Sequence, residues 1–243
     1  MGNSSLNVIL FGQTGSGKSS LINLMTGQDV ARVSSGAGGC TLTFQRHPFL
    51  VNGRHVQIWD TVGLDEPDME LKAIEQAYRL IRDWETHGGV DLLLFCIRAP
   101  RITVTSQANY RLFYEALCRS QVPIALAMTH LEQENDMEDW WRRNVGRLEE
   151  YGLKFAAHVC VTGLPTDSKY PESRRRVWDL LQAHCGERFT MPSETWFVES
   201  LPSFGLLSPL KRGFTRKAIM KVLVKRCGME QKKAEELAAK LEP

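Results

Sequence analysis

Eight residues near the start of the chain constrain its fold more than any others. Residues 12–19 read GQTGSGKS, which fits the pattern G-x-x-x-x-G-K-S. They follow a short apolar run at 7–11 and precede a helix-like run at 19–25. A glycine-rich loop between a strand and a helix directs backbone N–H groups at an anion, and the helix dipole adds to the attraction. The chain is therefore expected to hold a phosphate-binding loop, or P-loop, in a parallel α/β sheet.

This loop predicts binding of a purine nucleoside triphosphate together with Mg²⁺. The amine of Lys18 is expected to reach the β- and γ-phosphates, which makes it a candidate catalytic residue, and the hydroxyl of Ser19 to supply an oxygen to the metal. The candidate nucleotide-binding residues of the loop are Gly12, Gln13, Thr14, Gly15, Ser16, Gly17, Lys18, Ser19 and Ser20.

Two further segments are typical of a GTPase. Residues 60–63 read DTVG, about 40 residues after the P-loop lysine and at the end of a strand-like run. In this D-x-x-G motif, Asp60 is expected to hold the metal and the N–H of Gly63 to contact the γ-phosphate. A threonine between the two motifs should complete the metal shell when the γ-phosphate is present. Thr41 is the first candidate and Thr43 the second.

The segment expected to contact the base follows the apolar run 122–128. Guanine-specific proteins carry N/T-K-x-D here, whereas this chain carries Thr129, His130 and Glu132. A glutamate can still accept hydrogen bonds from the two guanine donors, although its side chain is one methylene longer than aspartate. Thr162 and Gly163 follow the last strand-like run and are expected to cover the base. Guanine is the predicted base, and adenine is the alternative if residues 129–132 do not contact it.

Strand-like and helix-like runs alternate along the chain, which predicts a parallel sheet with helices on both faces. One Asn-Gly pair, at 52–53, predicts a hairpin and so an antiparallel edge strand. The predicted fold is a three-layer α/β P-loop fold with a mostly parallel six-stranded sheet and a C-terminal helical extension. The expected strands are 7–11, 42–51, 54–60, 90–97, 122–128 and 158–161, and the expected helices are 19–25, 69–85, 106–118, 136–151 and 172–185.

The chain is expected to divide into a nucleotide-binding domain at 1–190, a connector at 191–210 and a basic helical extension at 211–243. The extension either packs on the domain with its charges solvated or contacts an acidic membrane surface. No nucleic-acid partner is expected, because the basic run contains few aromatic residues that could stack on bases.

Composition and charge mainly exclude certain kinds of site and certain classes of protein. The net charge is +2, and the six cysteines show no metal-binding spacing. No signal peptide is expected, and the sequence contains no apolar run of about 20 residues. A cytoplasmic protein is expected.

The motifs resemble those of the septin-like branch of P-loop GTPases, which includes the AIG1/GIMAP proteins and the Toc GTPases of chloroplast import. The resemblance rests on the P-loop with its following S-L-I-N, on D-T-x-G-L, and on T-H-x-x with a carboxylate, and it covers about residues 6–186. Arg101, Ile102 and Thr103 are similar to the G-R-[FY]-T stretch of the AIG1 type, with Pro100 in place of the glycine. The resemblance implies binding of GTP and GDP, and pairing of two G domains across the nucleotide.

Hydrolysis of GTP is expected to be slow. Leu64 occupies the position after D-x-x-G where related proteins place a glutamine that orients water. Arg98 and Arg101 are candidates for charges that act across a homodimer. Three functions remain open: a GTPase switch, a nucleotide-dependent assembly module with negligible hydrolysis, and an ATPase.

Overall fold

The computed structural model describes residues 5–31, 43–62, 79–183, 188–190, 192, 196, 217, 220, 224 and 231–240. Its strands are β1 (Leu6–Phe11), β2 (Thr43–Val51), β3 (Arg54–Val62), β4 (Leu92–Arg98), β5 (Ile124–Thr129) and β6 (Ala157–Cys160). Its helices are α1 (Lys18–Thr26), α3 (Val104–Tyr110), the π-helical segment η1 (Arg111–Leu117), α4 (Glu138–Glu150), α5 (Tyr170–Ala183) and α8 (Gln231–Lys240).

The six strands form one sheet in the order β2-β3-β1-β4-β5-β6. All neighbouring pairs are parallel except β2 with β3, which are antiparallel and joined by the hairpin turn at Asn52 and Gly53. The predicted six-stranded sheet with one antiparallel edge strand is confirmed. Every residue of β1 and β5 is buried, as their uninterrupted apolar runs require in the centre of a parallel sheet.

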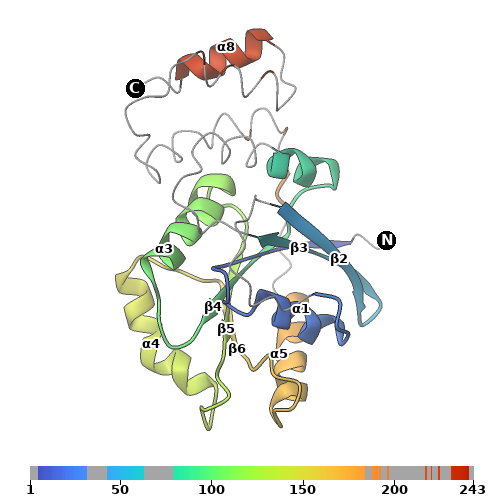
Figure 1. Ribbon diagram of the computed structural model, residues 1–243, viewed down its shortest axis with the longest axis vertical. Coiled ribbons are helices and arrows are strands. Elements are labelled where there is room, and N and C mark those ends of the chain that lie inside the picture. The colour runs from blue at the N-terminus through green and yellow to red at the C-terminus, as the bar shows by residue number, and fades with distance from the viewer. Residues whose placement is uncertain are drawn as a thin grey trace.

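Helices cover both faces of the sheet (Figure 1). On one face, α1 and α5 pack through a cluster that includes Leu21, Ile22 and Val177. On the other face, α3, η1 and α4 pack through a second cluster that includes Phe113 and Trp140. The molecule therefore has the three layers that the sequence predicts.

The observed bounds differ from the predicted ones by one or two residues at most element ends. The strand that carries Asp60 continues two residues further, to Val62, so Asp60 lies inside β3. The helix expected at 106–118 begins at Val104, because the side chain of Thr103 caps it, and it changes to a π-helix at Arg111. Of the helix expected at 69–85, residues 79–86 are described and are helical.

Parts of the C-terminal segment pack on the domain core. Phe189 pairs with Val90 as an isolated β-bridge. Trp196 is fully buried and lies against Trp84 and Phe189, with ring centroids 5.7 and 4.8 Å away. Ala234 of α8, at the top of Figure 1, is also buried in this cluster. The described C-terminal residues thus extend the core on the α3 and η1 side of the sheet.

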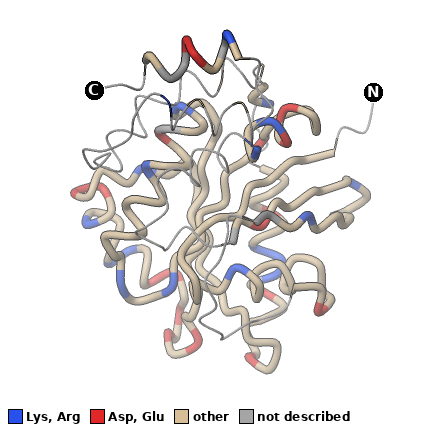
Figure 2. Tube along the Cα trace, turned by 45° about the horizontal axis from the view of Figure 1, so that its top comes forward, with Lys and Arg blue, Asp and Glu red and all other residues tan. Residues whose placement is uncertain are grey.

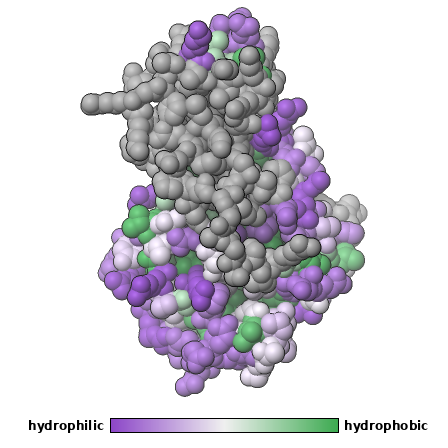
Figure 3. All heavy atoms as spheres, in the orientation of Figure 1, coloured by the Kyte–Doolittle hydropathy of each residue, from purple (hydrophilic) through white to green (hydrophobic). Residues whose placement is uncertain are grey.

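Along the described backbone, the positions of lysine and arginine are interspersed with those of aspartate and glutamate rather than gathered in blocks of one sign (Figure 2). On the face shown in Figure 3, hydrophilic residues predominate among the described atoms, and apolar residues occur as separate spots. Among the described helices, none combines the length and the apolar character that crossing a bilayer requires.

Candidate nucleotide site

The predicted site residues lie together at one edge of the sheet, the edge formed by the carboxyl ends of the parallel strands. The P-loop follows β1, Asp60 lies near the end of β3, Arg98 ends β4 and Thr129 ends β5. β1 lies between β3 and β4, so the chain connections diverge to opposite sides of β1. Ligands of open α/β sheets bind outside the carboxyl ends of the strands at such a switch point. The fold therefore places the P-loop where a ligand is expected.

The P-loop backbone is held closely against β4. Gly12 has φ +151°, and a Cβ there would lie 2.2 Å from the carbonyl oxygen of Cys96, so only glycine fits. Gly17, with φ +92°, is the N-cap of α1, and no side chain caps that helix. The first N–H groups of α1 thus lack a side-chain acceptor, which suits an anionic ligand. Thr14 and Gly15 are exposed at the tip of the loop.

Lys18 is 9% exposed and lies against the start of the loop. Its Nζ donates hydrogen bonds to the carbonyl oxygens of Gly12 at 2.8 Å and Gln13 at 3.0 Å. These two bonds hold the ammonium group at the loop, where a phosphate bound by the same backbone would meet it.

Asp60 is a buried carboxylate on the strand beside β1, paired in register with Leu10. Burial raises the pKa of Asp60, and the positive charge of Lys18 partly offsets this. Its Oδ1 atom is buried and has no hydrogen-bond partner among the described residues. A buried carboxylate oxygen without a partner is costly unless a cation or a water molecule contacts it. Asp60 therefore fits a residue that would hold a Mg²⁺ ion, and Ser19, the second residue of α1, remains the expected source of a further oxygen.

The loop expected to contact the base is tied directly to the P-loop. The hydroxyl of Thr129 donates a 2.7 Å hydrogen bond to the carbonyl oxygen of Ser16 and lies 2.9 Å from Nδ1 of His130. Cys96 donates from Sγ to the same carbonyl at 3.0 Å, and burial raises the pKa of this thiol to about 11. Burial, followed by the charge of Arg98, lowers the pKa of His130, which favours a neutral imidazole in this loop.

Glu132 is fixed by the loop that follows β6. The hydroxyl of Thr162 donates to Oε1 of Glu132 at 3.0 Å, and Thr162 is fully buried. The backbone N–H of Thr162 donates to Oγ of Ser173, so the hydroxyl and not the N–H faces the base loop. Gly163 approaches α1 closely, since a Cβ there would lie 2.8 Å from the Cβ of Ser20.

Arg98 and Arg101 are both exposed at the same edge. Arg98 is the last residue of β4 rather than a residue beyond it. The segment that carries Arg101 is linked to the P-loop, because the hydroxyl of Ser106 donates to Oε1 of Gln13 at 3.3 Å and also contacts Thr103. Thr41 and Gly63, the other two candidate catalytic residues, lie outside the described residues, as does Leu64. Thr43 begins β2.

Two residues near the base loop were not predicted from the sequence. Ser173 accepts the N–H of Thr162, as described above. Lys169 donates from Nζ to the carbonyl oxygens of Glu132 at 2.9 Å and Glu134 at 2.6 Å. No motif includes either residue, and more than 30 positions separate Lys169 from the carbonyls it contacts. The only available signal was that both loops follow neighbouring parallel strands.

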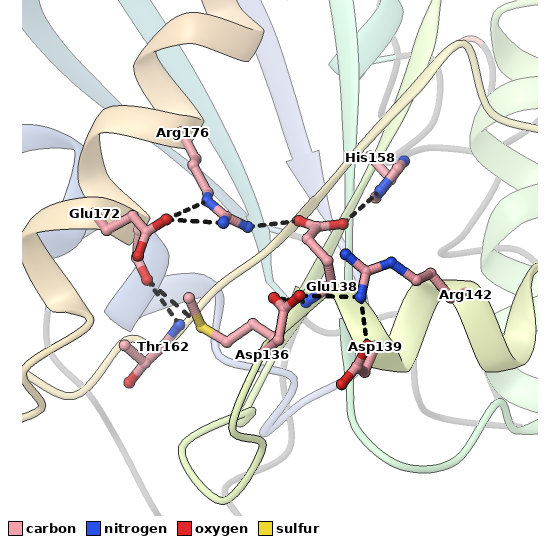
Figure 4. Close-up of polar contacts among 10 residues, drawn as sticks. Asp136, Glu138, Asp139, Arg142, His158, Thr162, Glu172 and Arg176 are labelled. Atoms are coloured by element: carbon pink, nitrogen blue, oxygen red, sulfur yellow. Dashed lines mark hydrogen bonds and ion pairs between the residues drawn. The ribbon is translucent and has the colours of Figure 1, made fainter.

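A polar network lies behind this region and joins α4, β6 and α5 (Figure 4). Glu138 accepts from Nε2 of His158 at 2.8 Å and from Nη1 of Arg176 at 2.7 Å. Arg176 also pairs with Glu172 at 2.8 Å. The hydrogen bond from His158 is the main reason that the pKa of Glu138 is lowered. This network fixes α4 against α5, the helices that flank the base loop and the loop after β6.

Comparison with known proteins assigns a family. Residues 7–130, just over half of the chain, match the family described as 50S ribosome-binding GTPase. The GTPase Der of Campylobacter fetus is 26% identical over 66% of this chain and 32% of its own length. The tRNA modification GTPase MnmE of Zymomonas mobilis is 39% identical over 41% of this chain and 22% of its own length. The chain therefore spans no more than about a third of these relatives.

Solved structures of similar fold include Era of Aquifex aeolicus bound to GDP and AlF4⁻, with 18% identity and a TM-score of 0.57 over 78% of this chain and 60% of that chain. Toc33 of Arabidopsis thaliana has 20% identity and a TM-score of 0.52 over 73% and 84%. A second Era structure, with MgGDPNP and a segment of 16S ribosomal RNA, has 17% identity and a TM-score of 0.56 over 78% and 60%. The family match and the P-loop geometry together show that the chain belongs to the 50S ribosome-binding GTPase family and is a GTP-binding G domain.

Proposed function

We propose that this protein is a slow GTPase that acts as a nucleotide-dependent switch or assembly module, and that pairing of two G domains across the nucleotide stimulates it. The observation that carries the proposal is the arrangement of Lys18 and the unpartnered Oδ1 of Asp60 beside a P-loop that Thr129 ties to the base loop. One contiguous set of residues thereby serves the phosphates, the metal and the base.

The residues act by binding and orientation. The P-loop N–H groups and Lys18 hold the phosphates, and Ser19 and Asp60, with Thr41 as the expected third residue, would hold Mg²⁺. The metal would stabilise the negative charge that develops on the phosphates during transfer. The N–H of Gly63 would contact the γ-phosphate. Leu64 offers no group that orients water, and this is the reason for proposing slow turnover.

Recognition of guanine is assigned to Glu132 and its surroundings. Its carboxylate, held by Thr162, would accept from the ring N1–H and the exocyclic amine. The alternative, an ATPase, predicts that adenine nucleotides bind as well as guanine nucleotides. Calorimetric titration with GTP, GDP, ATP and ADP separates the two, because a preference for GDP over ADP of less than about tenfold, roughly one hydrogen bond to a charged group, would contradict guanine recognition.

The proposed pairing rests on the exposed arginines at the nucleotide edge, Arg98 and Arg101. A solved structure of similar fold supports the proposed pairing, because dimerisation is important for the GTPase activity of the chloroplast translocon components Toc33 and Toc159. Turnover per molecule should rise with protein concentration, and Arg98→Ala or Arg101→Ala should abolish the rise. Arg147→Ala, which removes an exposed arginine of α4, is the matched control. Rates that are independent of concentration in the wild-type protein would exclude stimulation by pairing, and undetectable turnover at every concentration would favour the non-hydrolysing assembly module.

We further propose that the chain belongs to the septin-like branch with the AIG1/GIMAP and Toc proteins, that it is cytoplasmic, and that it divides at about residues 190 and 210. The similar fold of Toc33 and the Arg101-Ile102-Thr103 stretch support the branch. Because Ala234 of the extension at 211–243 is buried in the domain core, we propose that the basic residues of this extension either keep their charges solvated or contact an acidic membrane surface. Era, which has a similar fold, binds a segment of 16S ribosomal RNA, and this weakens the expectation that the protein has no nucleic-acid partner.

A further inference from the structure

Lys169 lies just before α5 and reaches back to the base loop. Its half-buried side chain donates to the carbonyl oxygens of Glu132 and Glu134, at 2.9 and 2.6 Å. Its own backbone is fixed in turn, because its N–H donates to Oδ1 of Asp167 at 2.8 Å. A cation is therefore held from one loop against two backbone acceptors of the other.

These contacts fix the turn that carries Glu132. The two carbonyls belong to residues on either side of position 133, and the N–H of Glu134 also donates to the carbonyl of Leu131 at 3.1 Å. Hydrogen bonds from an ammonium group are about twice as strong as neutral ones. When two carbonyl groups of one turn both accept from the same ammonium group, the peptide planes of that turn have little freedom to rotate. The Cα–Cβ direction of Glu132 is thereby set by Lys169.

The carboxylate end of the same side chain is set by a different residue. Thr162 donates to Oε1 of Glu132 at 3.0 Å, and the N–H of Leu164 donates to the hydroxyl of Thr162 at 3.1 Å, which orients that hydroxyl. A glutamate has one more rotatable bond than an aspartate and loses more conformational entropy when it is held. Restraint at both ends reduces that cost before the ligand arrives.

We propose that Lys169 is a positioning residue that sets guanine specificity, by holding the backbone of Glu132 while Thr162 holds its carboxylate. The inference rests on the proposed reading of guanine by Glu132. Lys169 does not contact the nucleotide in this proposal. It acts only through the direction in which Glu132 presents its oxygens.

The test compares GDP with IDP, which lacks only the exocyclic amine of guanine. A well-placed Glu132 accepts from both N1–H and the amine of GDP but only from N1–H of IDP. Wild-type protein should therefore prefer GDP by about tenfold or more, the size expected of one hydrogen bond to a charged group. Lys169→Met keeps the length of the side chain but removes the donors. It should bring the GDP-to-IDP preference to within about threefold, whereas Lys169→Arg should retain most of it.

The matched control is Arg143→Met, which removes the other cation that contacts the base-loop segment, through the carboxylate of Glu134. This variant should keep the wild-type GDP-to-IDP preference. Circular dichroism and the melting temperature monitor folding of all variants, but the decisive readout is the ratio, which a general loss of stability does not change. If Lys169→Met weakens GDP and IDP equally, the positioning role is overturned while guanine recognition stands. If wild-type protein does not prefer GDP over IDP or ADP, guanine recognition by Glu132 fails, and the positioning role with it.

Discussion

At the scale of single residues, the buried carboxylate of Asp60 has an electrostatic free-energy cost that a bound metal ion can relieve. The carboxylate is buried beside the P-loop, its pKa is raised by burial, and its Oδ1 has no partner among the described residues. Because the folded-state pKa lies above the unfolded one, the ionised form opposes folding at neutral pH. A metal ion contacting that oxygen would remove the penalty, so metal binding and stability should be linked at this residue.

Substitution Asp60→Asn tests this link. The amide is neutral and similar in shape, so the nucleotide-free variant is expected to melt at a higher temperature than the wild-type protein. Its Mg²⁺-dependent affinity for GDP should fall by at least about 10-fold, because even the loss of a residue that only supports a metal ligand costs about that much. Thermal melts with and without nucleotide and Mg²⁺ measure both effects. A variant that is less stable without nucleotide but binds Mg²⁺ and GDP normally would contradict the assignment.

Among the residues of the site, those in short motifs were predictable and those in long-range contacts were not. Gly12, Lys18 and Asp60 follow from local patterns, because their chemistry fixes both the residue type and its place near the carboxyl end of a strand. Lys169 contacts backbone carbonyl oxygens, which every residue carries. The identity of residues 132–134 therefore does not predict a contact with a side chain more than 30 positions away. The hydroxyl role of Thr162 likewise depends on the position of Ser173.

At the scale of elements, the packing of α4, β6 and α5 depends on one carboxylate. Glu138 contacts both His158 and Arg176, and the stacked rings of His158 and Trp141, 3.9 Å apart, cover the network on one side. The pKa of Glu138 lies below its ordinary value of 4.5, chiefly because of the hydrogen bond from His158. The ionised carboxylate therefore stabilises the fold at neutral pH, and this contribution is lost as the pH falls from about 4.5 through the lower folded-state value.

The expected result is that the free energy of unfolding falls more steeply with acidification in the wild-type protein than in Glu138→Gln. At neutral pH the variant should be the less stable of the two. Urea unfolding at a series of pH values between neutrality and about pH 3, below the ordinary glutamate range, measures the difference. Glu150→Gln, at the exposed end of α4, serves as a control and should follow the wild-type curve. Parallel curves for wild type and Glu138→Gln would show that the network does not couple to folding.

The elements themselves were largely predictable, for reasons that also explain the exceptions. β1, β4 and β5 are central strands, and their apolar runs leave no other place for them. The hairpin was predictable because Asn52 and Gly53 both adopt positive φ, at 48° and 79°. The change from α3 to the π-helical η1 was not, because the spacing of Tyr110, Phe113 and Leu117 fits an α-helix. In the structure the backbone N–H of Cys118 donates to the carbonyl of Phe113, five residues back, and the indole Nε1–H of Trp196 donates to the carbonyl of Leu117.

At the scale of the whole molecule, the C-terminal segment is connected to the domain core at two points. Arg188 pairs with the buried Asp91 at 2.8 Å, at the start of β4, where Asp91 also accepts the N–H of Asn7 at 2.7 Å. Further along, Trp196 is buried between Trp84 and Phe189. Trp196, which lies after the predicted end of the domain at residue 190, therefore contributes to the domain core.

Removal of this anchor should destabilise the whole protein. Trp196→Ala is expected to lower the free energy of unfolding by about 3–5 kcal/mol, as for other large aromatic residues truncated in a core. Trp141→Ala, which truncates a partly exposed ring on α4, should cost clearly less. Denaturant unfolding of both variants checks the order. If Trp196→Ala is as stable as the wild-type protein, the segment beyond residue 190 is an independent appendage.

The bond between the Thr129 hydroxyl and the Ser16 carbonyl has a consequence for the lifetime of the bound state. Ser16 belongs to the loop that is proposed to bind the phosphates, and Thr129 ends β5, directly before the loop that is proposed to bind the base. Because the bond is buried, one loop cannot withdraw while the other stays in place without leaving a polar group unpaired. We expect both halves of the nucleotide to be released in a single step, so an exchange factor would need to displace only one of the two loops to empty the site.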